Sequence, residues 1–138
     1  MKENNILEET KMFWDDHFPD QCPPIDARCE EMIVYRLTKQ KQPGKEDFLS
    51  HKMRYPSRDF SPLDCQACGL SVHTDYEDVL KLKNRLPALR KFHISIGRIF
   101  KDSGVVKETP SKNEKSHVTW WVRTGYQGIQ HHFSDYNA

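Results

Sequence analysis

The stretch from residue 70 to residue 77 constrains the fold more than any other part of this 138-residue chain. Residues 70–73 are a short, mostly apolar run that ends in His73, which is typical of a β-strand. Thr74 and Glu77 have the spacing of a capping box, so a helix is predicted to begin with Thr74 as its N-cap. A strand that turns directly into a helix N-terminus places backbone N–H groups where they can bind a ligand.

Several other segments have clear secondary-structure patterns. Strands are predicted where β-branched and aromatic residues gather, at residues 32–38, 92–99 and 116–122, with a short strand at 129–133 that pairs with the last of these. Helices are predicted over residues 5–17, which precede Pro19, and over about 75–86, which precede Pro87. Residues 43–64 are rich in proline and predict a long loop with one helical turn near 46–51, and such loops are usually functional or mobile.

These patterns predict an α+β protein that forms a single domain over residues 1–138. Its small, mainly antiparallel sheet is expected to form the core over residues 32–133, with one central helix. Residues 1–31 are expected to supply an acidic N-terminal helix and a proline-rich segment.

The charges are unevenly placed along a chain whose formal net charge is only +1. Residues 1–31 hold nine acidic and three basic residues, whereas residues 79–101 hold basic residues and no acidic ones. The basic tract can attract phosphate, or it can be a solvated helix face that pairs with the acidic N-terminal segment. No apolar run is long enough to cross a bilayer, so we expect no membrane partner. The N-terminus lacks the pattern of a secretory signal, so a cytoplasmic location is expected.

Cys65 and Cys68 have the spacing of one zinc knuckle and are followed by a glycine. A structural zinc ion needs four ligands, and Cys22 and Cys29 are too far apart in sequence to form a second knuckle. Cys65 and Cys68 are therefore candidate zinc ligands, with the other ligands supplied by long-range folding. The alternative is that the cysteines are buried free thiols.

Arg36 lies in the middle of an otherwise apolar predicted strand. A buried arginine needs a partner, which is either a structural carboxylate or an anion that binds in a cleft. Trp120 and Trp121 are adjacent strand residues, so one ring is expected to enter the core and the other to face outward. An exposed tryptophan would mark either a contact surface or a stacking platform.

His93 and His117 each begin a His-x-Ser/Thr pattern, which two-histidine phosphoesterases use for acid and base catalysis. Their short separation places them on successive strands instead of on separated repeats, so cross-strand packing explains the pattern equally well. The sequence has no nucleophile elbow and no glycine-rich phosphate loop.

The order of elements over residues 32–123 resembles the layout of the ADP-ribosyltransferase superfamily, especially its RNA 2′-phosphotransferase branch. The resemblance rests on the strand with Arg36, on Gly69-Leu70-Ser71-Val72-His73 before a capped helix, and on the late strand Ser116-His117-Val118-Thr119-Trp120. The chain has no His-Gly-Thr segment after its first strand, and His117 stands where toxin-type members carry a glutamate.

The resemblance implies a nucleotide-handling domain that binds NAD or a phosphorylated nucleotide. His73 and His117 would be catalytic, and Arg36, Ser71 and a basic residue such as Arg85 or Arg90 would bind the cofactor. This hypothesis requires Arg36, His73 and His117 to face one pocket. The alternative is a non-catalytic partner subunit that docks a larger protein or an RNA through the basic helix and an exposed tryptophan.

Overall fold

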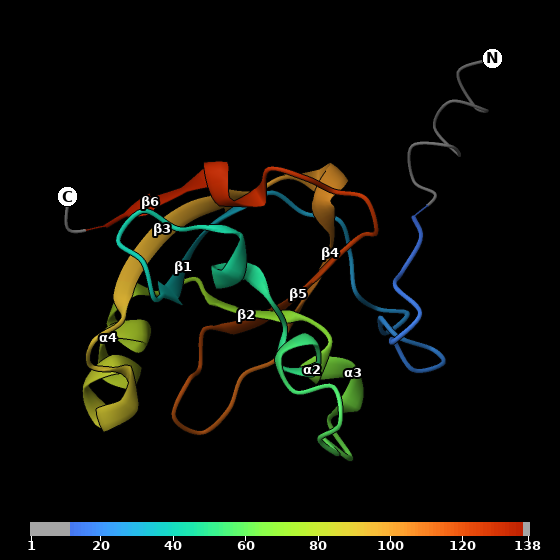
Figure 1. The fold of residues 1–138 in the computed structure, drawn as a ribbon, viewed down its shortest axis with the longest axis horizontal. Coiled ribbons are helices and arrows are strands. Elements are labelled where there is room, and N and C mark those ends of the chain that lie inside the picture. The colour runs from blue at the N-terminus through green and yellow to red at the C-terminus, as the bar shows by residue number, and fades with distance from the viewer. Residues whose placement is uncertain (1–11, 137–138) are drawn as a thin grey trace.

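The computed structural model describes residues 12–136 of the chain (Figure 1). The strands are β1 (Met32–Thr38), β2 (Leu70–His73), β3 (His93–Ile99), β4 (Gly104–Glu108), β5 (His117–Val122) and β6 (Phe133–Asp135). The α-helices in this part of the chain are α2 (His51–Arg54), α3 (Asp64–Ala67) and α4 (Tyr76–Arg85). Short 3-10 helices occur at Lys45–Phe48, Pro87–Leu89, Lys101–Ser103 and Ile129–His132.

The described strands form one antiparallel sheet in the order β4-β5-β2-β1-β3-β6. The α+β class and the mainly antiparallel sheet are therefore confirmed. β1 and β3 pair along their whole lengths, from Met32 opposite Ile99 to Thr38 opposite His93. β1 and β2 pair only at Tyr35 and His73. The sheet is thus tightly joined on one side of β1 and nearly open on the other.

The main hydrophobic core lies on one face of the sheet, because side chains alternate between the two faces along each strand. Val34, Val72 and Trp120 project into this core from three neighbouring strands, and Phe133 joins them from β6. The Phe133 ring lies directly over Gly97, where an added Cβ would be only 2.3 Å from the ring. This close approach explains why a glycine occupies the middle of β3.

A second apolar cluster covers the opposite face at β5. Trp121 is its central residue and packs with Phe18 and Cys22 of the N-terminal segment. Trp120 and Trp121 are each only 1% exposed, so the expectation of one outward-facing tryptophan is wrong. The alternation between faces does hold, but a segment distant in sequence buries the second ring.

The helix predicted over residues 5–17 is not found in the part that the structure describes, since residues 12–15 have no regular structure and 16–17 form a turn. Residues 5–11 lie outside the described residues. The carbonyl of Phe13 accepts a hydrogen bond from the Thr124 N–H at 2.9 Å, and the Asp15 carboxylate accepts one from the Thr124 hydroxyl at 2.6 Å. These tertiary contacts hold the segment against the chain that follows β5.

The strand predicted over residues 129–133 is also wrong. Residues 129–132 form a 3-10 helix, and the strand that follows, β6, pairs with β3 instead of with β5. The predicted helical turn near residues 46–51 is present as two short helices on either side of Leu49.

Helix α4 confirms the predicted central helix, but its N-cap is Asp75 and not Thr74. The Asp75 carboxylate accepts a hydrogen bond from the Glu77 N–H at 3.2 Å. The Thr74 N–H donates to the carbonyl of Ser116, so Thr74 still belongs to the contact between β2 and β5 and the helix begins one residue later. Within the described residues, no helix is long and apolar enough to cross a membrane.

Candidate functional site

The candidate site lies where the sheet splits between β1 and β2. Continuing the antiparallel register from Tyr35 and His73 would place Leu37 opposite Ser71, but the two strands do not pair there. Instead, the Arg36 guanidinium spans the gap, and its Nη1 donates to the carbonyl oxygen of Ser71 at 2.7 Å. A charged side chain therefore takes the place of a strand hydrogen bond.

Arg36 is only 9% exposed, and its described hydrogen-bond partners are carbonyl oxygens. Nε and Nη2 both donate to the carbonyl of Asp47, at 3.0 and 2.9 Å. The Asp47 carboxylate faces elsewhere, because it accepts hydrogen bonds from the backbone N–H groups of Lys39 and Gly44. No carboxylate among residues 12–136 lies within ion-pair distance of Arg36. Burial, together with the nearby charge of Arg54, lowers the pKa of Arg36 to about 10.

A cleft of about 470 Å³ opens at this split. Four of the predicted site residues line it together: Arg36, Ser71, His73 and His117. Its basic lining residues also include Lys39, His51 and Arg54, and Glu114 is the acidic residue of the lining. The charge of Arg36 and Arg54 adds to burial in lowering the pKa of His51. The cleft is therefore a cationic environment that favours an anionic ligand.

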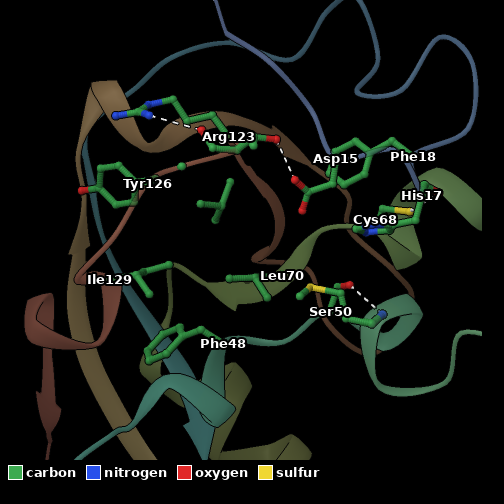
Figure 2. A pocket seen from close by; sticks show the side chains of 14 residues that line it. Asp15, His17, Phe18, Phe48, Ser50, Cys68, Leu70, Arg123, Tyr126 and Ile129 are labelled. Carbon is green, nitrogen blue, oxygen red and sulfur yellow. Dashed lines mark hydrogen bonds between the residues drawn. The ribbon is translucent and has the colours of Figure 1, made fainter.

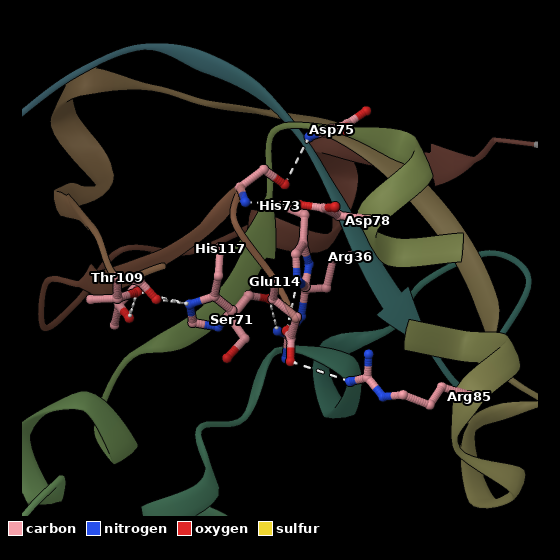
Figure 3. Close-up of polar contacts among 11 residues, drawn as sticks. Arg36, Ser71, His73, Asp75, Asp78, Arg85, Thr109, Glu114 and His117 are labelled. Atoms are coloured by element: carbon pink, nitrogen blue, oxygen red, sulfur yellow. Dashed lines mark hydrogen bonds and ion pairs between the residues drawn. The ribbon is translucent and has the colours of Figure 1, made fainter. Parts of the chain in front are cut away.

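The other two predicted basic residues, Arg85 and Arg90, do not line the cleft. Arg85 reaches its edge indirectly, since its Nη2 lies 3.8 Å from Oε2 of Glu114 (Figure 3). Arg90 contributes a backbone carbonyl that accepts a hydrogen bond from Lys83 Nζ. The structure thus separates both residues from Arg36.

His73 and His117 are direct cross-strand neighbours on β2 and β5. Their ring centroids are 5.3 Å apart in an edge-on arrangement, and both side chains are buried. His93 does not join them, because it lies on β3 opposite Thr38, and β1 and β2 separate it from β5. The histidine pair therefore differs from the one that the His-x-Ser/Thr pattern indicates.

His73 forms a polar chain with Glu114 and Arg85 (Figure 3). His73 Nε2 lies 2.8 Å from Glu114 Oε1, and since a carboxylate only accepts, the histidine nitrogen carries the proton. The contact orients the imidazole and keeps the proton on Nε2.

His117 has the opposite environment. Its Nδ1 lies 3.2 Å from the carbonyl oxygen of Thr109 and 2.8 Å from the hydroxyl of the same residue (Figure 3). A carbonyl only accepts, so the contact with it is a hydrogen bond when Nδ1 carries the proton, and the neutral ring then keeps its lone pair on Nε2. Burial, with the neighbouring His73, lowers the pKa of His117 and so favours this neutral form. The pair thus combines a histidine suited to donate a proton with one suited to accept it.

A second, smaller cavity of about 200 Å³ lies between the N-terminal segment and the chain after β5 (Figure 2). Asp15, His17 and Phe18 line one side of it, and Arg123 and Tyr126 line the other. The bond between the Asp15 carboxylate and the Thr124 hydroxyl joins the two sides. It lacks a buried charge of the kind that Arg36 places in the larger cleft.

The structure pairs one cysteine of the predicted zinc knuckle with a residue outside it. Cys65 forms a disulfide with Cys22, and a sulfur in that bond is not a thiolate ligand. Cys68 is a buried free thiol, and burial raises its pKa, which disfavours the thiolate form. Among residues 12–136, no cluster of three or more His, Cys, Asp or Glu side chains could hold a metal ion.

Sequence reasoning missed Glu114, His51 and Arg54 as cleft residues. Glu114 lies in a polar loop with no motif of its own, and only the chain path brings it to His73. His51 and Arg54 lie in the long segment 43–64, whose length was the available signal of a functional loop. Comparisons of the chain with protein-family models, with curated proteins and with solved structures found no match. The site geometry therefore carries the functional argument.

Proposed function

We propose that this chain binds a phosphorylated nucleotide in the cleft between β1 and β2, with Arg36 on a phosphate group. The observation that carries the proposal is a buried guanidinium that lines a cleft and has carbonyl oxygens, not a carboxylate, as its described partners. A buried cation with no carboxylate in direct contact is costly, and an anionic ligand offsets that cost. Three of the five guanidinium N–H groups are used in the described contacts, which leaves two for the ligand.

The remaining lining favours a nucleotide over a small inorganic anion. Arg54 and Lys39 add positive charge, whereas Leu49, Leu82, Leu89 and Phe92 supply apolar surface. A phosphate needs the first set of side chains, and a base or nicotinamide ring packs on the second. The cleft volume of about 470 Å³ falls in the usual range for small-molecule sites. NAD and mononucleotides are both candidates.

Within this proposal, His73 and His117 are the catalytic residues. Neutral His117 would accept a proton through Nε2, and His73, held by Glu114, would donate one. The partner-subunit hypothesis loses its exposed tryptophan, since Trp120 and Trp121 are both buried. Nucleotide binding is therefore the function that the described geometry favours.

A thermal-shift screen with ADP, NAD and AMP tests the proposal. A nucleotide at about 100 times its dissociation constant should stabilise the native protein by roughly 2.7 kcal/mol, which raises the melting temperature by several degrees. Arg36→Met should abolish that ligand-induced rise. The comparison is made within each variant, because the substitution also removes hydrogen bonds to the carbonyls of Asp47 and Ser71.

Arg98→Met is the matched control, since Arg98 is also a strand arginine but its side chain is 51% exposed and lies outside the cleft. It should keep the full ligand-induced rise. Arg54→Met gives a second cleft variant, and it should weaken the response without removing it. The proposal is contradicted if no nucleotide shifts the wild-type protein, or if Arg36→Met responds like Arg98→Met.

A further inference from the structure

Residues 52–60 carry a surface of basic and aromatic side chains. We name it the 52–60 surface and define it by Lys52, Arg54, Tyr55, Arg58 and Phe60. Tyr55 is 46% exposed, and Arg58 is also exposed. Exposed aromatic rings beside cations are the usual means by which proteins bind unpaired nucleotides.

The side chains of the 52–60 surface contact one another. The Arg58 guanidinium lies 4.1 Å from the centre of the Tyr55 ring and 5.8 Å from that of Phe60. Lys52 Nζ lies 5.9 Å from the centre of the Phe60 ring. These contacts keep the rings and the positive charges in one layer on the protein surface.

The cations of this surface form no ion pair within the described chain. Lys52, Arg54 and Arg58 have no carboxylate within ion-pair distance among residues 12–136. Asp59, the acidic residue of the segment, accepts a hydrogen bond from the Ser61 N–H at 2.9 Å, which lowers its pKa and directs it to its own backbone. The surface therefore keeps positive charge for a partner.

The 52–60 surface is continuous with the cleft. Arg54 and Tyr55 belong to the surface and also line the cleft that contains Arg36. Helix α2 carries Lys52 and Arg54 and lies beside α3 (Figure 1). Helix α3 directly precedes β2 in the chain, and β2 supplies residues of the cleft. A ligand held on Arg36 can therefore extend from the cleft onto this surface.

We propose that the nucleotide bound at Arg36 is one residue of a single-stranded nucleic acid, whose adjoining nucleotides lie on the 52–60 surface. This inference rests on the proposed function of the cleft. Adjoining bases would stack on Tyr55 and Phe60, and the phosphates between them would meet Lys52 and Arg58. An isolated nucleotide would leave this surface unused. A duplex would hide the base faces that the rings need.

Fluorescence anisotropy with labelled octamers tests the inference, using oligouridine RNA, oligothymidine DNA and a DNA duplex as probes. Unlabelled UMP and TMP, measured by displacement of the octamers and by thermal shift, report on the cleft alone. A single strand should bind at least tenfold more tightly than its mononucleotide and than the duplex, and its affinity should fall steeply with salt. The RNA and DNA arms show which sugar the site takes.

Arg58→Met and Phe60→Leu alter the surface without altering residues that line the cleft. Each should weaken octamer binding about tenfold while leaving mononucleotide binding within twofold. Lys81→Met, at an exposed position on the basic helix α4, is the matched control and should leave octamer binding unchanged.

Three results overturn this inference and leave the proposed function intact. The first is mononucleotide binding with octamer binding that is no tighter. The second is octamer binding that Arg58→Met and Phe60→Leu do not weaken, and the third is equal binding of the duplex. If neither mononucleotides nor octamers bind, the proposed function fails, and the inference fails with it.

Discussion

The two edges of β1 show how one strand can serve both stability and binding. On the β3 side, β1 pairs along its whole length, from Met32 to Thr38. On the β2 side, it pairs only at Tyr35, and the Arg36 side chain bridges the remaining gap. In the regular ladder, backbone N–H and C=O groups of β1 bond to those of β3. At the open edge, the Arg36 side chain donates to the backbone carbonyl of Ser71 instead. The sheet therefore loses backbone pairing at the place where its buried cation lines a cleft.

The two sides of β1 also differ in the chemistry of their side chains. The β3 side leads to Phe133, which is buried among apolar rings, including Phe48 at 5.0 Å between centroids. The β2 side leads to His73, His117 and Glu114, which can exchange protons or meet a ligand. We infer that the open edge between β1 and β2 is the part of the sheet that responds to ligand and to pH.

The largest expected effect is on the β3 side. Phe133→Ala removes a ring that is 2% exposed and leaves a cavity above Gly97, so it should lower the free energy of unfolding by about 3–5 kcal/mol. Denaturant titration measures this change. Leu63→Ala, at a side chain that is 57% exposed, is the control and should change stability by less than about 0.5 kcal/mol. A small loss for Phe133→Ala would show that this ring does not stabilise the sheet as its burial indicates.

A smaller effect is expected from pH on the β2 side. The pKa values of His117 and His51 lie below their ordinary value of 6.5 in the folded protein. As pH falls below about 6.5, the unfolded chain therefore binds protons first, and the free energy of unfolding should decrease between pH 7 and pH 5. This stability is present above pH 6.5 and is lost on acidification.

Denaturant titrations across this pH window check the expectation, since the carboxylates of the unfolded chain titrate mostly at lower pH. His117→Gln should reduce the slope of stability against pH, because it removes one of the two groups. An unchanged slope would show that His117 does not titrate differently in the folded and unfolded states.

Local sequence patterns predicted the strands and the helix whose apolar residues follow a regular spacing. β1 and β2 have the bounds that their apolar runs indicate, and α4 matches its helical pattern to within a residue. The apolar run of residues 92–99 likewise identified β3, although Gly97 and Ile99 face the main core and Ile94 and Ile96 lie on the opposite face. In each case, the signal lies within the segment itself, so no knowledge of the rest of the chain was needed.

The errors share a different physical origin, which is contact between distant segments. The helix expected at 5–17 gives way over its described part to contacts with Thr124, and Trp121 is covered by Phe18 and Cys22. The disulfide of Cys65 depends on a partner 43 residues away. No local pattern of residue types contains this information.

The candidate site likewise combines residues that a local pattern indicates with residues that only contacts between distant segments bring there. Arg36 in an apolar strand and His73 before a helix were visible in the sequence, and both line the cleft. Glu114 was not visible, because its role depends on a loop that folds back onto β2. The split between β1 and β2 was also hidden, because no residue pattern in either strand indicates that pairing is lost after Tyr35.

The most direct test of the central claim is amide hydrogen exchange of the whole protein with and without saturating ADP. The account predicts slower exchange on ADP binding in residues 36–39, 51–55 and 69–73, which surround the split between β1 and β2. Exchange in β3 should stay unchanged, because its ladder with β1 is already complete. Protection confined to residues 122–129 at the smaller cavity, or no protection at all, would contradict the account.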